Sequence, residues 1–168
     1  MSFKQIPFGT LEEFNVVVEI PKGSELKYEY NEKIDALTLD WVFTDGFGFI
    51  YNYGFIPQTL CGDGDNFDVF LITPYPIAIG TVVKSRAVGM IELLDREEED
   101  NKIIAVPIAD PSLEKYQKLS DLDFDYKTEF TDFFNEISKQ KNKTMKINGF
   151  HDKLIALDAI KQSRENYR

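Results

Sequence analysis

The stretch CGDGDNFDVFLI (residues 61–72) joins an acidic turn containing glycine to a short apolar run. Asp63, Asp65 and Asp68 stand close together in it, with no Lys or Arg among them. Like charges at this spacing repel and raise each other's pKa unless a positive charge lies between them. The stretch therefore predicts a turn that leads into a β-strand, and it suggests a cation site. A plain turn is the alternative, because Asp and Gly are common turn residues.

Short runs with strand character lie on both sides of this stretch. Before it they cover residues 15–21, 26–33 and 36–43, and the last two form an expected hairpin. After it they cover residues 80–95, as one or two strands, and 102–108. Several short strands at this spacing favour a closed or sandwiched β structure over a βαβ sheet.

The pattern becomes helical after Pro111. Residues 112–122, 127–142 and 152–167 have apolar residues at helical spacing, and Asp152 suits an N-cap. Phe130, Phe133 and Phe134 fall on one face of the second segment, together with Ile137. We therefore expect an α+β fold, a small barrel with helices packed on it, formed by residues 1–168 as a single domain.

Composition limits the classes of partner. The chain has 168 residues, of which 43% are hydrophobic and 29% charged, as in an ordinary globular protein. Its formal net charge of -10 argues against nucleic acid or an anionic membrane as a partner, because both would be repelled. The acidity can also serve solubility alone. A single cysteine fits a reducing compartment, and the N-terminus has no long apolar run, so we expect a cytoplasmic protein.

A second acidic group lies in LDREEEDNK (residues 94–102), at the far end of an expected strand. By itself this run is typical of a solvated turn. If it meets the first acidic turn at one rim of a barrel, the two form an all-oxygen site, which suits Mg²⁺ above all.

Other catalytic chemistries find little support. The sequence contains no GxGxxG, GxxxxGK[ST] or GxSxG motif. His151 is the only histidine, which excludes sites built from several histidines, and we expect it at the surface or in packing. Cys61 has no nearby histidine to activate it and is expected to be a buried small residue.

Several motifs in order resemble those of the family I soluble inorganic pyrophosphatases. They are NYGFIPQT (52–59), DGDNFDV (63–69), TPYPIAIGTVV followed by RAVGMIELLD up to residue 95, and AVP (105–107). The resemblance spans about residues 15–150. It implies a five-stranded OB-like barrel with helices and the hydrolysis of pyrophosphate to two phosphates. It also implies Mg²⁺ as cofactor, with Mn²⁺ or Co²⁺ as substitutes, and a homohexamer.

The resemblance also implies roles for individual residues. Asp63, Asp68 and Asp100 match ligands of the metal that activates water. Asp95, with Asp100, matches ligands of a metal that arrives with substrate. Asp65 matches the general base.

The same resemblance assigns residues on the substrate side. Lys27, Tyr53 and Lys102 match contacts to substrate phosphate. Glu19 and Glu29 match acids that hold a further ion through water, with Glu29 close to the substrate.

Some positions depart from the family pattern. Trp41 stands where an Arg that binds phosphate is typical, Phe49 where a Tyr is usual, and Arg96 where an acid is common. Ile137 and Ser138 stand where a Tyr-Lys pair is expected. We therefore expect the metal-binding residues to be complete, and the residues that bind phosphate to be fewer than in the family pattern. Three outcomes are open: weak turnover of pyrophosphate, a different phosphate substrate, or compensation by Arg96 or by Lys139, Lys141 and Lys143. We expect a pyrophosphatase that is less efficient than a relative with the full motif.

Two alternatives to an inorganic pyrophosphatase remain open. One is a phosphohydrolase for another diphosphate or phosphoanhydride, for which the indole of Trp41 could stack on an organic group. The other is a catalytically weakened relative that binds metal or serves in an assembly. Retention of Asp65 argues against the second, because a binding protein needs no general base.

Overall fold

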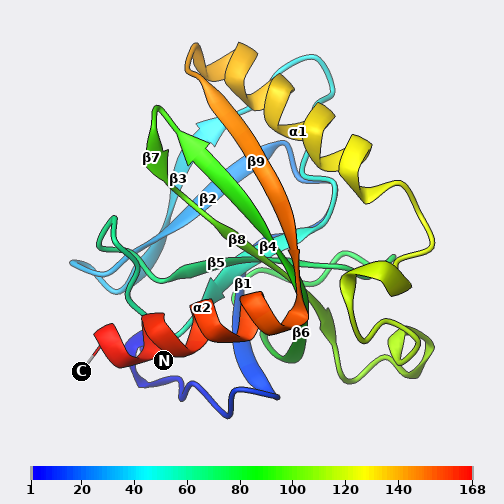
Figure 1. Cartoon of the computed structure of the whole chain (residues 1–168). Coiled ribbons are helices and arrows are strands. Elements are labelled where there is room, and N and C mark those ends of the chain that lie inside the picture. Colours follow the sequence, from blue (N-terminus) through cyan, green and yellow to red (C-terminus); the bar gives the residue numbers. More distant parts are fainter. Residues whose placement is uncertain (1, 168) are drawn as a thin grey trace.

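The structure is a computed structural model and describes residues 2–167 (Figure 1). Its strands are β1 (Phe14–Ile20), β2 (Leu26–Asn31), β3 (Ala36–Val42), β4 (Asn52–Ile56), β5 (Phe67–Leu71), β6 (Val82–Asp95), β7 (Glu98–Glu99), β8 (Lys102–Pro107) and β9 (Met145–Asp152). Its helices are α1 (Tyr126–Lys141) and α2 (Lys153–Asn166), with short 3-10 turns η1 (Phe3–Gln5), η2 (Pro111–Leu113) and η3 (Leu119–Asp121). No helix in this described range is long and apolar enough to cross a membrane.

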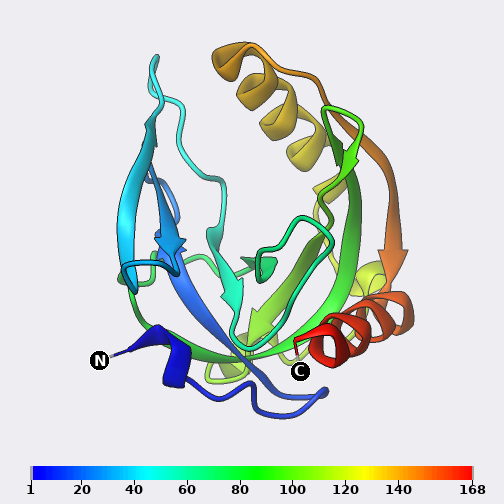
Figure 2. The same ribbon diagram turned by 90° about the vertical axis from the view of Figure 1, so that its left-hand side faces the viewer.

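Five strands close into a ring in the order β1, β4, β5, β8, β6, because β6 pairs again with β1. The β5–β8 pairing is parallel and the other four are antiparallel. The prediction of a small five-stranded barrel within an α+β fold is confirmed. The hairpin β2–β3 forms a separate sheet, and β9 extends the barrel from β6. The β2–β3 hairpin and α1 lie on opposite sides of the upper end of the barrel (Figure 2).

Two apolar clusters fix the helices on the barrel. On one side Phe70 packs against Phe130 and Phe133 of α1, and on the other Ile160 of α2 packs with barrel residues such as Phe14. Strands this thoroughly buried read as nearly continuous apolar runs, which is why β1 and β8 stand out in the sequence.

Helix α1 buries the face that the sequence predicted. Phe130, Phe133, Phe134 and Ile137 are all buried. Asn142 ends the helix in the left-handed region with a φ of 48°, so that the chain turns directly towards β9. The predicted N-cap of α2 is also confirmed, because the carboxylate of Asp152 accepts a hydrogen bond from the Lys153 N–H.

The expectation of a helix over residues 112–122 is wrong. This segment holds only the 3-10 turns η2 and η3. The guanidinium of Arg86 binds the carbonyl oxygens of Leu113 and Tyr116, and the carboxylate of Asp121 accepts the N–H groups of residues 117 and 118. These contacts use backbone groups that a helix would have paired internally. Strand β9 is a further difference, since its sequence had indicated no element.

Candidate metal and phosphate site

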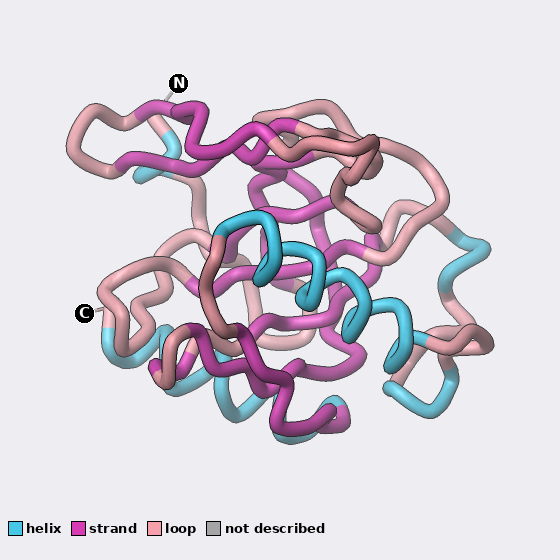
Figure 3. The backbone as a smooth tube through the Cα atoms, turned by 90° about the horizontal axis from the view of Figure 1, so that it is seen from above, coloured by secondary structure: helices cyan, strands magenta, loops and turns pink. Residues whose placement is uncertain are grey.

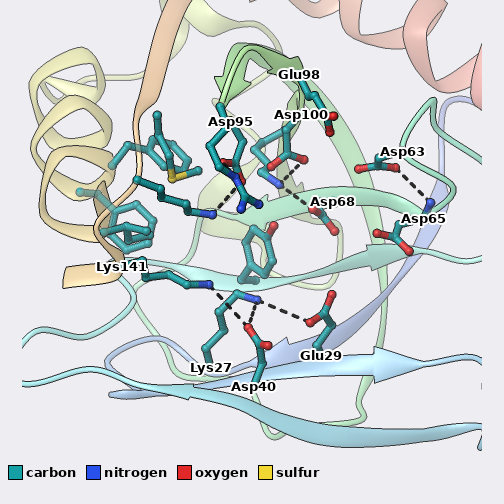
Figure 4. A pocket seen from close by; sticks show the side chains of 18 of the residues that line it. Lys27, Glu29, Asp40, Asp63, Asp65, Asp68, Asp95, Glu98, Asp100 and Lys141 are labelled. Carbon is teal, nitrogen blue, oxygen red and sulfur yellow. Dashed lines mark hydrogen bonds and ion pairs between the residues drawn. The ribbon is translucent and has the colours of Figure 1, made fainter. Parts of the chain in front are cut away.

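A cavity of about 360 Å³ opens between the hairpin β2–β3, the rim of the barrel and the C-terminal end of α1 (Figure 4). Figure 3 looks down on α1, with strands on both sides of it. Nine carboxylates line the cavity: Glu29, Asp40, Asp63, Asp65, Asp68, Asp95, Glu98, Glu99 and Asp100. Five cationic side chains line it as well: Lys27, Arg96, Lys102, Lys141 and Lys143. The cavity therefore has a formal excess of four negative charges.

The first acidic turn depends on Gly64. Its φ of +90° lies in the region that side chains disfavour, so a glycine is suited to it. The Gly64 N–H donates to the Cys61 carbonyl at 3.0 Å, and the Asp65 N–H donates to Asp63 Oδ1 at 3.0 Å. Partial burial, together with the charges of Asp63 and Asp68, raises the pKa of Asp65 to about 6. A tight turn thus places Asp65 beside other acids.

The second acidic group reaches the same cavity. Asp95 ends β6, Asp100 follows β7, and both line the cavity with Asp63 and Asp68. The two acidic groups therefore lie at one rim of the barrel, which is the condition under which the sequence allows an all-oxygen site. Glu97, Glu98 and Glu99 are exposed, as expected of a solvated turn, and Glu98 and Glu99 also line the cavity.

Lys102 supplies a positive charge within the acidic group. Its ammonium lies 2.6 Å from Asp68 Oδ2 and 2.8 Å from Asp100 Oδ1, and its side chain is 6% exposed. Burial opposes this charge, but the surrounding acids, Asp68 first, hold the pKa of Lys102 well above its usual range. The same ammonium lies 5.6 Å from the ring centroid of the buried Tyr53. Lys102 and Tyr53 thus form one buried unit beneath the carboxylates.

Glu19 lies outside the main cavity. It lines an adjoining hollow of about 70 Å³ together with Glu29, Tyr53 and Asp65. Its carboxylate accepts the Tyr30 N–H at 2.8 Å. Burial, and then the charge of Asp68, raises the pKa of Glu19 to about 8. Of the residues predicted for the site, Glu19 alone is separated from the main cavity in this way.

Lys27 and Lys141 lie on the side of the cavity opposite Asp63 and Asp65 (Figure 4). Lys27 Nζ lies 2.7 Å from Asp40 Oδ2, and Lys143 Nζ lies 2.7 Å from Asp95 Oδ2. Asp40 was not predicted from the sequence. Its position follows from the hairpin, in which the neighbouring Trp41 pairs with Lys27 next to an irregularity in register.

The substituted positions have structural roles. Phe49 and Ile137 are buried and form part of the apolar wall. The hydroxyl of Ser138 donates to the Phe134 carbonyl at 2.8 Å and accepts the Met145 N–H at 3.2 Å, which ties α1 to β9. Among the candidate compensating residues, Arg96, Lys141 and Lys143 line the cavity. Lys139 is exposed and does not.

Three other side chains lie apart from the cavity. Trp41 does not line it, and its ring has the ammonium of Lys141 at 5.2 Å from the centroid. His151 Nε2 lies 2.6 Å from Glu92 Oε2 on the neighbouring strand, and both side chains are partly exposed, which fits the surface or packing position expected for His151. Cys61 is partly buried, and burial raises the pKa of its thiol to about 12, which disfavours the thiolate.

The carboxylates that line the cavity suit a hard divalent cation, although they are not yet arranged around one point. Carboxylate oxygens are the ligands that Mg²⁺ prefers, and the cavity carries an excess of them. Within residues 2–167, no three His, Cys, Asp or Glu side chains already surround one point as metal ligands. The structure thus brings Asp63, Asp68, Asp95 and Asp100 to one cavity without closing them around a single ion.

Comparison with known proteins identifies the family. The sequence pattern of the inorganic pyrophosphatase family matches residues 16–168. The chain belongs to the inorganic pyrophosphatase family. Among curated members, an inorganic pyrophosphatase of Saccharolobus solfataricus is 40% identical over 157 residues, which are 92% of this chain and 91% of that protein. Soluble inorganic pyrophosphatase 1 of Arabidopsis thaliana is 37% identical over 159 residues, 95% of this chain and 75% of that protein.

Solved structures of inorganic pyrophosphatases share the fold. That from Thermus thermophilus superposes with a TM-score of 0.92 at 33% identity, and 99% of each chain is covered. That from Neisseria gonorrhoeae gives a TM-score of 0.88 at 35% identity with the same coverage. The ring of five strands and its two helices are therefore the architecture of inorganic pyrophosphatases.

Proposed function

We propose that this chain hydrolyses inorganic pyrophosphate to two phosphates with Mg²⁺ as its cofactor. The observation that carries the proposal is a single cavity that brings together the acids of two separate turns and several lysines, with Asp63 and Asp65 on the side opposite Lys27 and Lys141. Pyrophosphate is densely negative, and a cavity with excess carboxylates repels it unless cations are bound there. Both the acids and the lysines have a use in this reaction.

Asp63, Asp68, Asp95 and Asp100 would hold the metal ions. When bound, Mg²⁺ lowers the pKa of water and neutralises charge on the phosphoanhydride. Mn²⁺ and Co²⁺ are the expected substitutes. Glu19 and Glu29, in the adjoining hollow, would support a further ion through water.

Asp65 is the proposed general base. It stands beside Asp63 on the same turn, within the group of acids that would hold the metal. Its pKa of about 6 belongs to the metal-free protein, because the charges of Asp63 and Asp68 help to raise it. Mg²⁺ bound to these two residues would offset that effect and favour the ionised carboxylate, which is the form that accepts a proton.

Lys27, Lys102 and Tyr53 would contact substrate phosphate. Fixed ammonium groups stabilise charge that builds on a leaving phosphate, and they do so more strongly in a partly dry cavity than in water. Lys102 is held in place by its two carboxylates, so it needs little reorganisation during the reaction.

Phosphate release from Mg²⁺ and pyrophosphate tests the proposal. We expect turnover by the purified protein, and a loss of about 10²- to 10⁴-fold in kcat for Asp65→Asn. Asp132→Asn is the matched control, because Asp132 is exposed on α1 and does not line the cavity. No phosphate release above the level of Asp65→Asn would overturn the proposal.

The structure gives the two alternatives no specific support. Trp41 is not part of the cavity lining and is already paired with Lys141, so its indole is not positioned to stack on an organic substrate. A panel of other diphosphates and phosphoanhydrides, compared with pyrophosphate at equal concentration, would reveal a different substrate. A purely metal-binding or assembly role would leave every member of the panel intact.

A homohexamer in the cytoplasm is proposed from the family resemblance described above. Exposed apolar side chains at Leu154 and Ile155, on the first turn of α2, are compatible with contact between subunits. Light scattering coupled to size exclusion tests the assembly, and a monomeric mass at micromolar concentration would contradict it.

A further inference from the structure

We propose that Lys141 and Lys143, where α1 ends and turns towards β9, form an anion subsite that holds one phosphate group of the substrate. This inference rests on the proposed function and names chain-specific residues on its phosphate side. Both side chains line the main cavity, and they are only 18% and 14% exposed. Lys139, in the last turn of the same helix, is exposed instead.

The cations on this side outnumber the carboxylates that bind them closely. The Lys27 ammonium forms an ion pair with Asp40 Oδ2 at 2.7 Å. The Lys143 ammonium forms one with Asp95 Oδ2 at 2.7 Å. In the described part of the chain, Lys141 has no hydrogen-bond acceptor, and its one ion pair is to Asp40 at 3.8 Å. An under-paired ammonium within a cavity leaves hydrogen-bond donors for an incoming anion.

The electrostatics of Lys141 agree with this geometry. Burial, followed by repulsion from the ammonium groups of Lys27 and Lys143, lowers the pKa of Lys141. A bound phosphate between the three lysines would remove that repulsion and form charge-assisted hydrogen bonds.

Trp41 is a positioning residue for this subsite. Its ring lies under the Lys141 ammonium at 5.2 Å from the centroid, a cation–π distance. Trp41 faces Lys27 across the hairpin, so one strand pair orients both lysines. Ile137 is buried and Ser138 is occupied by backbone contacts, so neither offers an anion a free donor from the preceding turn.

A simpler explanation is that these lysines only stabilise the C-terminal end of the helix, where cations are favourable. Lys139 provides the matched control, because it carries the same charge in the last turn of α1 but is exposed and outside the cavity. If these lysines act only by stabilising the end of the helix, Lys139→Met and Lys141→Met should change anion binding and turnover equally.

The test measures binding as well as turnover in the full chain. Isothermal titration with the non-hydrolysable analogue imidodiphosphate in Mg²⁺ gives affinity, and phosphate release from pyrophosphate gives kcat and KM. We expect Lys141→Met and Lys141→Gln to weaken analogue binding by about 10- to 100-fold and to raise KM more than they lower kcat. Lys143→Met should act in the same direction, Lys141→Arg should recover most of the affinity, and Lys139→Met should match the wild type.

Wild-type affinity for imidodiphosphate in both neutral Lys141 variants would overturn the inference, provided that thermal unfolding shows them folded. Equal losses in Lys139→Met and Lys141→Met would also overturn it. Failure of the proposed function is seen separately, as a wild type that binds the analogue but releases no phosphate. A wild type that hydrolyses pyrophosphate but whose affinity is indifferent to Lys141 rejects the subsite alone.

Discussion

Lys102 Nζ lies 2.6 Å from Asp68 Oδ2 because the parallel pairing of β5 and β8 places these two residues opposite one another. The pairing inserts a buried ammonium among carboxylates that would otherwise repel one another. The barrel topology therefore supplies part of the positive charge that the crowded aspartates require. The remaining excess of negative charge is what the proposed Mg²⁺ ions would neutralise.

Lys102→Met should destabilise the metal-free protein by about 1–3 kcal/mol, because it leaves the partly buried carboxylates of Asp68 and Asp100 without their partner. Urea unfolding in EDTA measures this. Lys84→Met is the control, since Lys84 and Glu13 form an exposed pair at 3.8 Å and such pairs contribute little. Indistinguishable midpoints for the two variants would contradict the role assigned to Lys102.

Gly64→Ala should cost about 1–2 kcal/mol of stability, because alanine is disfavoured at a φ of +90°. It should also lower phosphate release, since Asp63 and Asp65 are positioned by this turn. Gly62→Ala is a matched control in the same turn: a Cβ added at either glycine would meet nothing within 4 Å, but only Gly64 of the two has a positive φ. Full activity and stability in Gly64→Ala would show that the turn does not depend on the left-handed residue.

In EDTA, the free energy of unfolding should fall as the pH rises from about 5 to 8. The folded pKa of Glu19 is about 8 and its ordinary value is 4.5, so between these values the folded state binds more protons than the unfolded state. Its contribution is therefore favourable at low pH and is lost as the carboxyl ionises. Thermal unfolding across this range measures the effect, and Glu19→Gln should flatten it. An unchanged slope in that variant would assign the pH dependence to other groups.

The sequence predicted those features that depend on local periodicity. The buried face of α1, with Phe130 and Phe133, follows from helical spacing, and the strands of the barrel follow from their apolar runs. The meeting of the two acidic turns was only a condition in the sequence, because it depends on the long-range pairing of β8 with β5 and β6.

The features that were missed depend on distant contacts. Residues 112–122 have a helical pattern, but Arg86, far away in the sequence, binds their carbonyl groups. Asp40 reaches the cavity only through the register of the hairpin. The sequence also did not show which lysine could bind a phosphate group, because this depends on where α1 ends. The left-handed conformation of Asn142 turns the chain so that Lys143 reaches Asp95.

A crystal structure grown in excess Mg²⁺ with imidodiphosphate tests the central claim most directly. We expect Mg²⁺ ions bound by Asp63, Asp68, Asp95 and Asp100, with one phosphate group of the analogue against Lys141. Carboxylates that extend into bulk water with no ion coordinated, in a crystal where the analogue is bound elsewhere, would contradict it.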